Sequence, residues 1–128
     1  MRVFKTRTLA KFARRNGISD DSLADAVYRA ERGLIDADLG GHIIKQRVAR
    51  TGQGRRGGFR MLIGFRSDRA VFLFGFAKNE RENIDDAEMA TLRDIIRSLL
   101  AASAEKIAQA LKDGTLIEVP YEKSKHQG

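Results

Sequence analysis

Hydrophobic and polar positions at the start of the chain follow first a strand and then a helical period. Residues 1–5 form a short β-type run. Apolar residues then recur every three or four positions in two segments, one that begins at Thr6 or Thr8 and one that begins at Ser19. Hydroxyl side chains at such positions accept hydrogen bonds from the free amides of a helix's first turn. The pattern therefore predicts a strand followed by a helical hairpin.

The middle of the chain changes to β-type runs, which follow in succession at 42–48, 59–66 and 70–77, with a tight turn between the last two. Alternate residues of a strand point to opposite faces. The two faces of the second run carry Phe59, Met61, Ile63 and Phe65, and Arg60, Leu62, Gly64 and Arg66. Lys45 and Arg47 share one face of the first run. We therefore expect one sheet face to be aromatic core and the other to be available for cations.

Helical spacing returns in the C-terminal part. A helix is predicted from near Asp85 or the next residue, and Ser103 is the expected cap of a last helix, which ends at Gly114. A short edge strand is expected before Pro120. The 128 residues are enough for one domain with a real core. We therefore expect a single domain in which 103–128 is a helical extension with a polar tail.

Charge is distributed unevenly. The net charge is +7, and residues 1–60 hold 14 Lys or Arg against 6 Asp or Glu, whereas residues 82–128 hold 6 against 9. The run 39–67 contains no acid and seven bases, which are Lys45, Arg47, Arg50, Arg55, Arg56, Arg60 and Arg66. Bases fixed on ordered strands create a local positive field that concentrates polyanions. This run predicts a phosphate-binding surface for RNA or DNA, with a merely solvated basic face as the alternative.

The residue types that are missing limit the chemistry. The chain has no Cys and only two His, and no metal-ligand motif lies in its basic region, so we expect neither a metal nor a cofactor. The letters GxGxxG occur at 52–57, but this loop opens a strand instead of a helix, which argues against a dinucleotide site. No run is apolar enough to span a bilayer, and no signal peptide is recognisable. We expect a soluble, cytoplasmic protein.

Arg60 is the strongest candidate for contact with a phosphate, because a rigid strand can aim its guanidinium in bidentate fashion. Its alternative role is an ion pair with an acid of the C-terminal helix. Lys45 and Arg47 could hold the two sides of a phosphodiester, or simply form an exposed polar strand face. The segment 78–81, KNER, lies at the end of the most apolar run and is either functional or a charged turn. His42 is more readily a packing or capping residue than a catalyst.

The order of these motifs resembles the RelE/ParE superfamily of bacterial toxins from type II toxin–antitoxin modules. Three phrases carry the resemblance, ERGLIDADLGGHIIKQR, GQGRRGGFR and GFAKNERENI, and they point to its HigB-like branch over about Met1 to Leu100. The resemblance implies an α+β fold, with a small antiparallel sheet of about four strands against the N-terminal hairpin and C-terminal helices. It also implies a metal-independent endonuclease that cuts mRNA in the ribosomal A site and is silenced by a helix-turn-helix antitoxin, without a membrane partner.

The resemblance also implies a cationic centre, formed by Lys45, Arg47, Arg60, Lys78 and Arg81. Some relatives carry a tyrosine or histidine just after the final strand, where this chain has 83–86, NIDD. Asp85 or Lys78 is therefore a candidate for the general acid or base. Two alternative functions stay open at this point, a non-catalytic ParE-like inhibitor of DNA gyrase and a non-toxic RNA-binding module. The extension from Ser103 is either a cap on the fold or an antitoxin contact.

Overall fold

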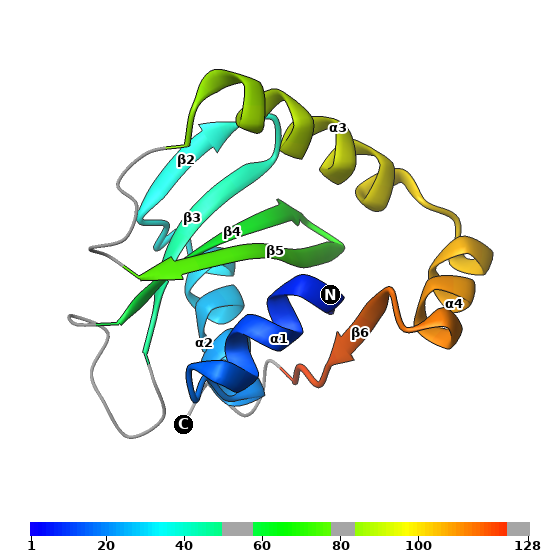
Figure 1. Cartoon of the computed structure of the whole chain (residues 1–128), viewed down its shortest axis with the longest axis horizontal. Helices are drawn as coiled ribbons and strands as arrows, with labels where there is room; N and C mark the ends of the chain where they lie inside the picture. Colours follow the sequence, from blue (N-terminus) through cyan, green and yellow to red (C-terminus); the bar gives the residue numbers. More distant parts are fainter. Residues whose placement is uncertain (50–57, 78–83, 123–128) are drawn as a thin grey trace.

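The structure, a computed structural model, describes residues 1–49, 58–77 and 84–122. Within these residues the chain forms one six-stranded sheet and four helices (Figure 1). The strands are β1 (Arg2–Thr6), β2 (Ala37–Gly40), β3 (Ile43–Val48), β4 (Phe59–Arg66), β5 (Arg69–Ala77) and β6 (Leu116–Val119). The helices are α1 (Arg7–Arg15), α2 (Asp20–Glu31), α3 (Asp86–Ala101) and α4 (Ala104–Asp113). The predicted α+β class is confirmed.

Each of the four described helices begins where the sequence places a capping side chain. The caps are Thr6, Ser19, Asp85 and Ser103. Each cap accepts a hydrogen bond from an amide of the first turn, which would otherwise lack a partner. Gly114 ends α4 with a φ of 77°, a left-handed conformation that glycine adopts without a steric penalty.

The strand order of the sheet is β2-β3-β4-β5-β1-β6. Neighbouring strands are antiparallel except β1 and β5, which are parallel. The sheet thus has more strands than the four or so that were predicted. One of the additional strands, β6, is the edge strand expected before Pro120, whereas β2 and the parallel pairing of β1 with β5 were not predicted. The predicted tight turn between β4 and β5 is confirmed, because Arg66 pairs with Arg69. Ser67 and Asp68 form the loop between them.

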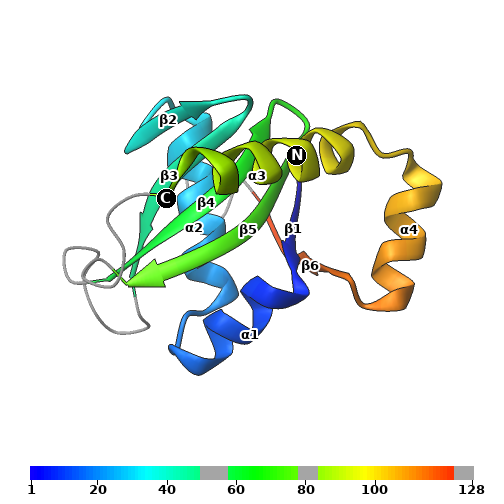
Figure 2. The same cartoon turned by 45° about the horizontal axis from the view of Figure 1, so that its top comes forward.

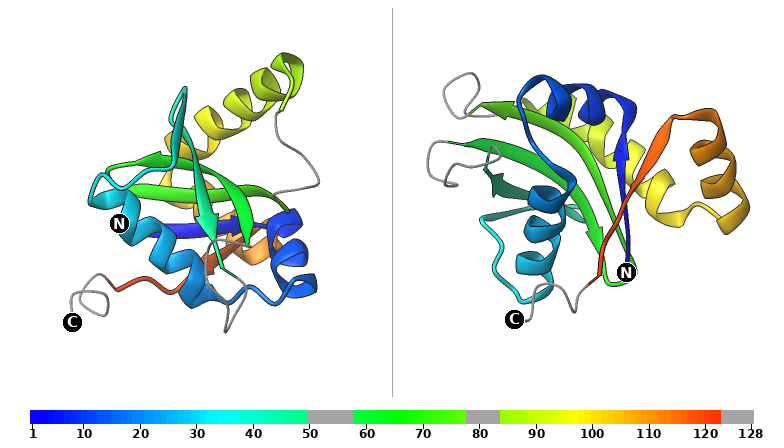
Figure 3. Two further views of the ribbon diagram at one scale, coloured as in Figure 1. Left: turned by 90° about the vertical axis from the view of Figure 1, so that its left-hand side faces the viewer. Right: turned by 90° about the horizontal axis from the view of Figure 1, so that it is seen from below.

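Helices cover both faces of the sheet. Viewed along the sheet, α1 and α2 lie on one side and α3 on the other (Figure 3, left). The α1/α2 face holds the predicted aromatic set, with Phe59, Met61 and Ile63 buried and Phe65 packed against them. The opposite face forms a second core beneath α3 and α4. Figure 2 shows α3 crossing the strands of this face.

The second core corrects the expectation of a cationic sheet face. Leu62 is fully buried in it. Gly64 lies so close to α3 that a Cβ atom there would come within 1.8 Å of Ile96 Cδ1. Alternation along β4 is as predicted, but α3 covers the middle of the strand. Only the two ends, at Arg60 and Arg66, remain available for charged side chains on this face.

The C-terminal extension closes the other edge of the sheet. β6 pairs with β1, and the guanidinium of Arg2 forms a two-point ion pair with Glu118 across them at 2.9 and 3.0 Å. The Tyr121 hydroxyl donates a hydrogen bond to Glu31 at the end of α2. Burial and the nearby carboxylate raise the pKa of Tyr121. The described part of the extension therefore contributes to the fold.

Candidate nucleic-acid site

The strand register brings three of the predicted cations together at one end of β3 and β4. Arg47 pairs directly with Arg60, and Lys45 pairs with Leu62. Residues directly opposite in an antiparallel pair point to the same face, and diagonal neighbours lie about 7 Å apart. Lys45, Arg47 and Arg60 therefore share the α3 face of the sheet, and Arg60 lies at the end of β4 opposite Arg66. We call these three residues the cationic strand end.

Arg60 has an unusual environment within the cationic strand end. Arg60 lies on β4 opposite Phe76 of β5, and it is only partly exposed. Its Nη1 atom is buried, and no group of the residues that the structure describes hydrogen-bonds to it. A buried donor without a partner costs about 1–3 kcal/mol, and more when the group is charged. Among the described residues no acid of α3 forms an ion pair with Arg60, so its alternative structural role is not observed there.

Arg47 is held by a carboxylate. Its backbone amide donates to Asp36 Oδ2 at 2.6 Å, and its Nε and Nη2 donate to Asp36 Oδ1 at 3.3 Å. Like charges directly opposite on a sheet repel, and this contact draws Arg47 toward Asp36 and away from Arg60. The Arg47 side chain remains about half exposed. It is therefore available to a phosphate only in competition with Asp36.

Asp36 itself is stabilised as a carboxylate. Burial is the largest single influence on its pKa and raises it. The hydrogen bonds from the amide and guanidinium of Arg47, with the charges of Arg47 and Arg29, together outweigh burial, so the pKa of Asp36 is lowered. Arg29 of α2 also donates to Asp25 at 3.0 Å and to the Arg47 carbonyl at 2.6 Å. Helix α2 thus holds the end of β3 that carries Arg47.

Gln46 was not predicted from the sequence and is fully buried between Lys45 and Arg47. Its Nε2 donates to the carbonyls of Ala26 and Leu34 at 3.0 and 3.1 Å. Its Oε1 accepts from the Asp36 amide at 2.8 Å. The side chain therefore positions the segment that carries Asp36. A polar residue on the core face of a strand is the only sequence signal for this role.

A cavity of about 1040 Å³ lies next to Arg47, between the end of α2 and β3. It is lined by Asp25, Tyr28, Arg29, Arg32, Gly33, Leu34, Ile35, Asp36 and Arg47. The guanidinium of Arg32 lies 5.6 Å from the Tyr28 ring centroid, a cation–π distance. Leu34 is 56% exposed. Sequence reasoning missed this region, because two of its three bases, Arg29 and Arg32, come from the end of α2, outside the acid-free run.

Two other predicted residues are placed elsewhere and have structural contacts. Arg66 lies at the opposite end of β4, where it donates to Asp68 at 2.8 and 3.2 Å and to the Leu100 carbonyl at 2.7 Å. Asp85 caps α3 by accepting from the Glu88 amide at 2.8 Å. Neither is brought to Arg60 by these contacts. The roles predicted for both in phosphate binding or acid–base chemistry stay predictions.

Five predicted residues lie outside the described residues, and so does the glycine loop 52–57. They are Arg50, Arg55, Arg56, Lys78 and Arg81. Within the described residues, no group of three or more His, Asp or Glu side chains is placed to hold a metal ion. None of the helices in this part of the chain is long and apolar enough to cross a membrane.

The fold and the cationic strand end define a small α+β protein with three cations on one face of neighbouring strands. A family model described as "RelE toxin of RelE / RelB toxin-antitoxin system" matches residues 1–119. The chain therefore belongs to the RelE toxin family, as the sequence motifs indicate. The match continues past Leu100 through α4 and β6. A comparison with curated proteins gave no match.

Proposed function

We propose that this toxin is a ribosome-dependent, metal-independent mRNA endonuclease that inhibits translation in the cytoplasm. The observation that carries the proposal is Arg60 Nη1, a buried cationic donor that has no hydrogen-bond partner among the described residues. A fold keeps such a costly group when a ligand completes its hydrogen bonds. Membership of a RelE toxin family makes an RNA phosphate the fitting ligand.

Cleavage without a metal proceeds by in-line attack of the 2′-hydroxyl on the adjacent phosphorus. The 2′-oxygen forms a bond to phosphorus and loses its proton to a base, while the bond to the 5′-oxygen breaks and that oxygen takes a proton from an acid. The product strand ends in a 2′,3′-cyclic phosphate. Arg60 and Lys45 would stabilise the charge on the pentavalent phosphate. Lys78, Arg81 and Asp85 remain the proposed additional members of the centre.

The proposed partners are mRNA in the ribosomal A site, the ribosome and a helix-turn-helix antitoxin. A carboxylate of the antitoxin could mimic the phosphate by binding Arg60, because charge-assisted hydrogen bonds to a desolvated guanidinium are strong. Such a contact would give mutual exclusion between antitoxin and RNA. An antitoxin complex that binds RNA oligonucleotides with the affinity of the free toxin would contradict this mode of inhibition.

The test is cleavage of mRNA on purified ribosomes, with the cut sites mapped by primer extension. Arg60→Ala should lower kcat/KM about 100-fold, which corresponds to about 3 kcal/mol of lost transition-state stabilisation. Arg60→Lys keeps the positive charge but loses the planar guanidinium, so its kcat/KM should lie between those of the wild type and Arg60→Ala. Arg15→Ala, at an exposed position of α1, is the matched control and should cleave normally.

Two outcomes would contradict the proposal. The first is a folded Arg60→Ala protein that cleaves at the wild-type rate, which would remove Arg60 from the centre. The second is a wild-type protein that leaves mRNA intact while expression blocks thymidine incorporation, which would favour the gyrase inhibitor. Circular dichroism of each variant shows whether lost cleavage reflects lost folding.

A further inference from the structure

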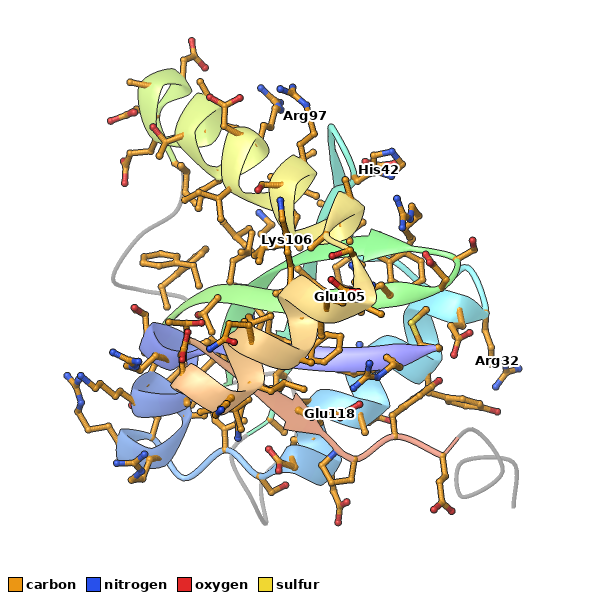
Figure 4. All side chains as sticks on the ribbon, turned by 90° about the vertical axis from the view of Figure 1, so that its right-hand side faces the viewer. Arg32, His42, Arg97, Glu105, Lys106 and Glu118 are labelled. Atoms are coloured by element: carbon orange, nitrogen blue, oxygen red, sulfur yellow. The ribbon has the colours of Figure 1, made fainter. Side chains whose placement is uncertain are left out.

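A second group of cations lies at the opposite end of β4 from Arg60. A cavity of about 200 Å³ is lined there by Gly41, His42, Arg66, Arg93, Arg97, Leu100 and Ala101. Its basic side chains come from three elements, the β2–β3 turn, the end of β4 and the C-terminal half of α3. In Figure 4 the side chains of Arg97 and His42 extend outward at the same end of the molecule. We call His42, Arg66, Arg93 and Arg97 the distal cluster.

The distal cluster has more cationic donors than its own contacts use. Arg93 donates through Nη2 to the Leu39 carbonyl at 2.9 Å. Arg97 meets Asp94 at 3.3 Å, but both side chains are more than three-quarters exposed, and such a pair contributes little. Arg66 forms the stronger pair with Asp68. No Asp or Glu side chain lines the cavity.

Convergence of like charges at a cavity is unfavourable in the free protein. Three guanidiniums line the cavity and no carboxylate does, so their charge is balanced only by the Arg66–Asp68 pair and the exposed Arg97–Asp94 pair outside the lining. An anion would relieve the repulsion and accept the unused N–H groups. Binding of an anion should therefore raise the stability of the folded chain. In the absence of an anion, removal of one cation should also raise the stability, because it reduces the repulsion.

The backbone next to the distal cluster is shaped around these side chains. His42 has a φ of 66°, and it is the only non-glycine residue with positive φ in the part of the chain that the structure describes. A left-handed backbone conformation is strained at a non-glycine residue. A Cβ atom on Gly41 would lie 3.0 Å from Arg93 Cδ. The turn thus places an imidazole at the cavity and leaves room for Arg93.

We propose that the distal cluster binds a backbone phosphate of RNA, separate from the phosphate at Arg60. Guanidinium forks match the oxygens of a phosphate group, and the three arginines of the lining favour an anion over an uncharged side chain. The six-residue separation along β4 places the two sites roughly 20 Å apart, with α3 between them. RNA as the source of the phosphate rests on the proposed function, but binding of the anion itself does not.

The first experiment measures thermal unfolding with inorganic phosphate against sodium chloride of equal ionic strength. Phosphate should raise the midpoint of the wild-type protein. Arg93→Gln and Arg97→Gln should each weaken phosphate binding about tenfold, and Arg97→Gln, which loses only an exposed ion pair, should also raise the midpoint in the absence of phosphate. Arg15→Gln is the control and should do neither. Equal effects of phosphate and chloride on the wild-type protein would overturn the site.

His42→Gly separates a binding role from a purely structural one. Removal of the strained side chain should raise the unfolding midpoint and also reduce the phosphate-dependent increase. A higher midpoint with an unchanged phosphate effect would remove His42 from the site.

The Arg60→Ala protein should keep most of the phosphate-dependent increase in its unfolding midpoint, because the two sites are separate. Complete loss of the effect in Arg60→Ala would assign phosphate binding to the cationic strand end and overturn the proposal.

The second experiment identifies the source of the phosphate with a fluorescent single-stranded RNA 12-mer. Each lost phosphate contact should flatten the log–log dependence of affinity on salt by about 0.7. Arg97→Gln should show this change, and so should Arg97→Gln combined with Arg60→Ala relative to Arg60→Ala alone. If phosphate stabilises the protein but Arg97→Gln leaves RNA affinity and its salt dependence unchanged, the RNA assignment is wrong. Neither experiment requires cleavage of RNA, so a failure of the endonuclease proposal would show only in the ribosome cleavage assay and not in these binding measurements.

Discussion

Replacement of Gln46 by leucine should destabilise the protein and loosen the edge of the sheet that holds Arg47. Three backbone groups lose their partner in Gln46→Leu, the carbonyls of Ala26 and Leu34 and the Asp36 amide. Ala26 lies inside α2, so its carbonyl keeps a helical hydrogen bond. The other two groups each cost about 1–3 kcal/mol when unsatisfied. We therefore expect a loss of about 3 kcal/mol.

Urea unfolding followed by far-UV circular dichroism measures this loss, with the m-value as a check that both states remain comparable. Gln109→Leu is the matched control. Gln109 is exposed on α4 and donates only to Asp113 at 2.8 Å, so its replacement should change stability by less than about 0.5 kcal/mol. A Gln46→Leu protein within 1 kcal/mol of the wild type would refute the reasoning, because water would then replace these hydrogen bonds at little cost.

Two further predictions concern α3 and the contact between Asp36 and Arg47. Gly64→Ala should lower the free energy of unfolding by about 1–3 kcal/mol, because the added methyl group collides with Ile96. In a double-mutant cycle, Gly64→Ala should cost much less in an Ile96→Ala background, and additive losses of stability would place the clash elsewhere. Asp36 has a lowered folded-state pKa, so its contribution is present above its ordinary pKa of 3.8 and is lost as pH falls through the folded value. The stability difference between wild type and Asp36→Asn, measured by urea unfolding, should therefore shrink below about pH 4, and a pH-independent difference would contradict this assignment.

Local signals predicted most of the elements of the fold, because caps and alternation act over a few residues. Thr6, Ser19, Asp85 and Ser103 are the helix caps, and the β4–β5 turn lies where the alternation breaks. The strand β2 was not predicted because its sequence, ADLG, is poor in the β-branched and aromatic residues that favour strands. The parallel pairing of β1 with β5 depends on contacts between residues far apart in sequence, which periodicity cannot indicate.

The candidate site was predicted in composition better than in arrangement. Residue type and period two placed Lys45 and Arg47 on one face of the first run and Arg60 on one face of the second, and the strand register shows that these faces coincide. Neither signal could indicate that α3 covers Leu62, because the packing of a helix against a sheet depends on both surfaces. Nor could they indicate that Asp36 engages Arg47, since Asp36 lies outside the acid-free run.

The anchoring of α3 distinguishes two routes by which an antitoxin could act. Displacement of α3 would expose Met89, Ile96 and Leu100, which are buried, at a cost of about 6 kcal/mol. It would also break the hydrogen bonds from Arg66 and Arg69 to the carbonyls at the end of the helix. A carboxylate placed on Arg60 instead satisfies a donor that has no partner among the described residues. We therefore expect the antitoxin complex to keep α3 in place, with its backbone amides protected from hydrogen exchange at least as strongly as in the free toxin. Faster exchange along α3 in the complex would show that displacement is the route.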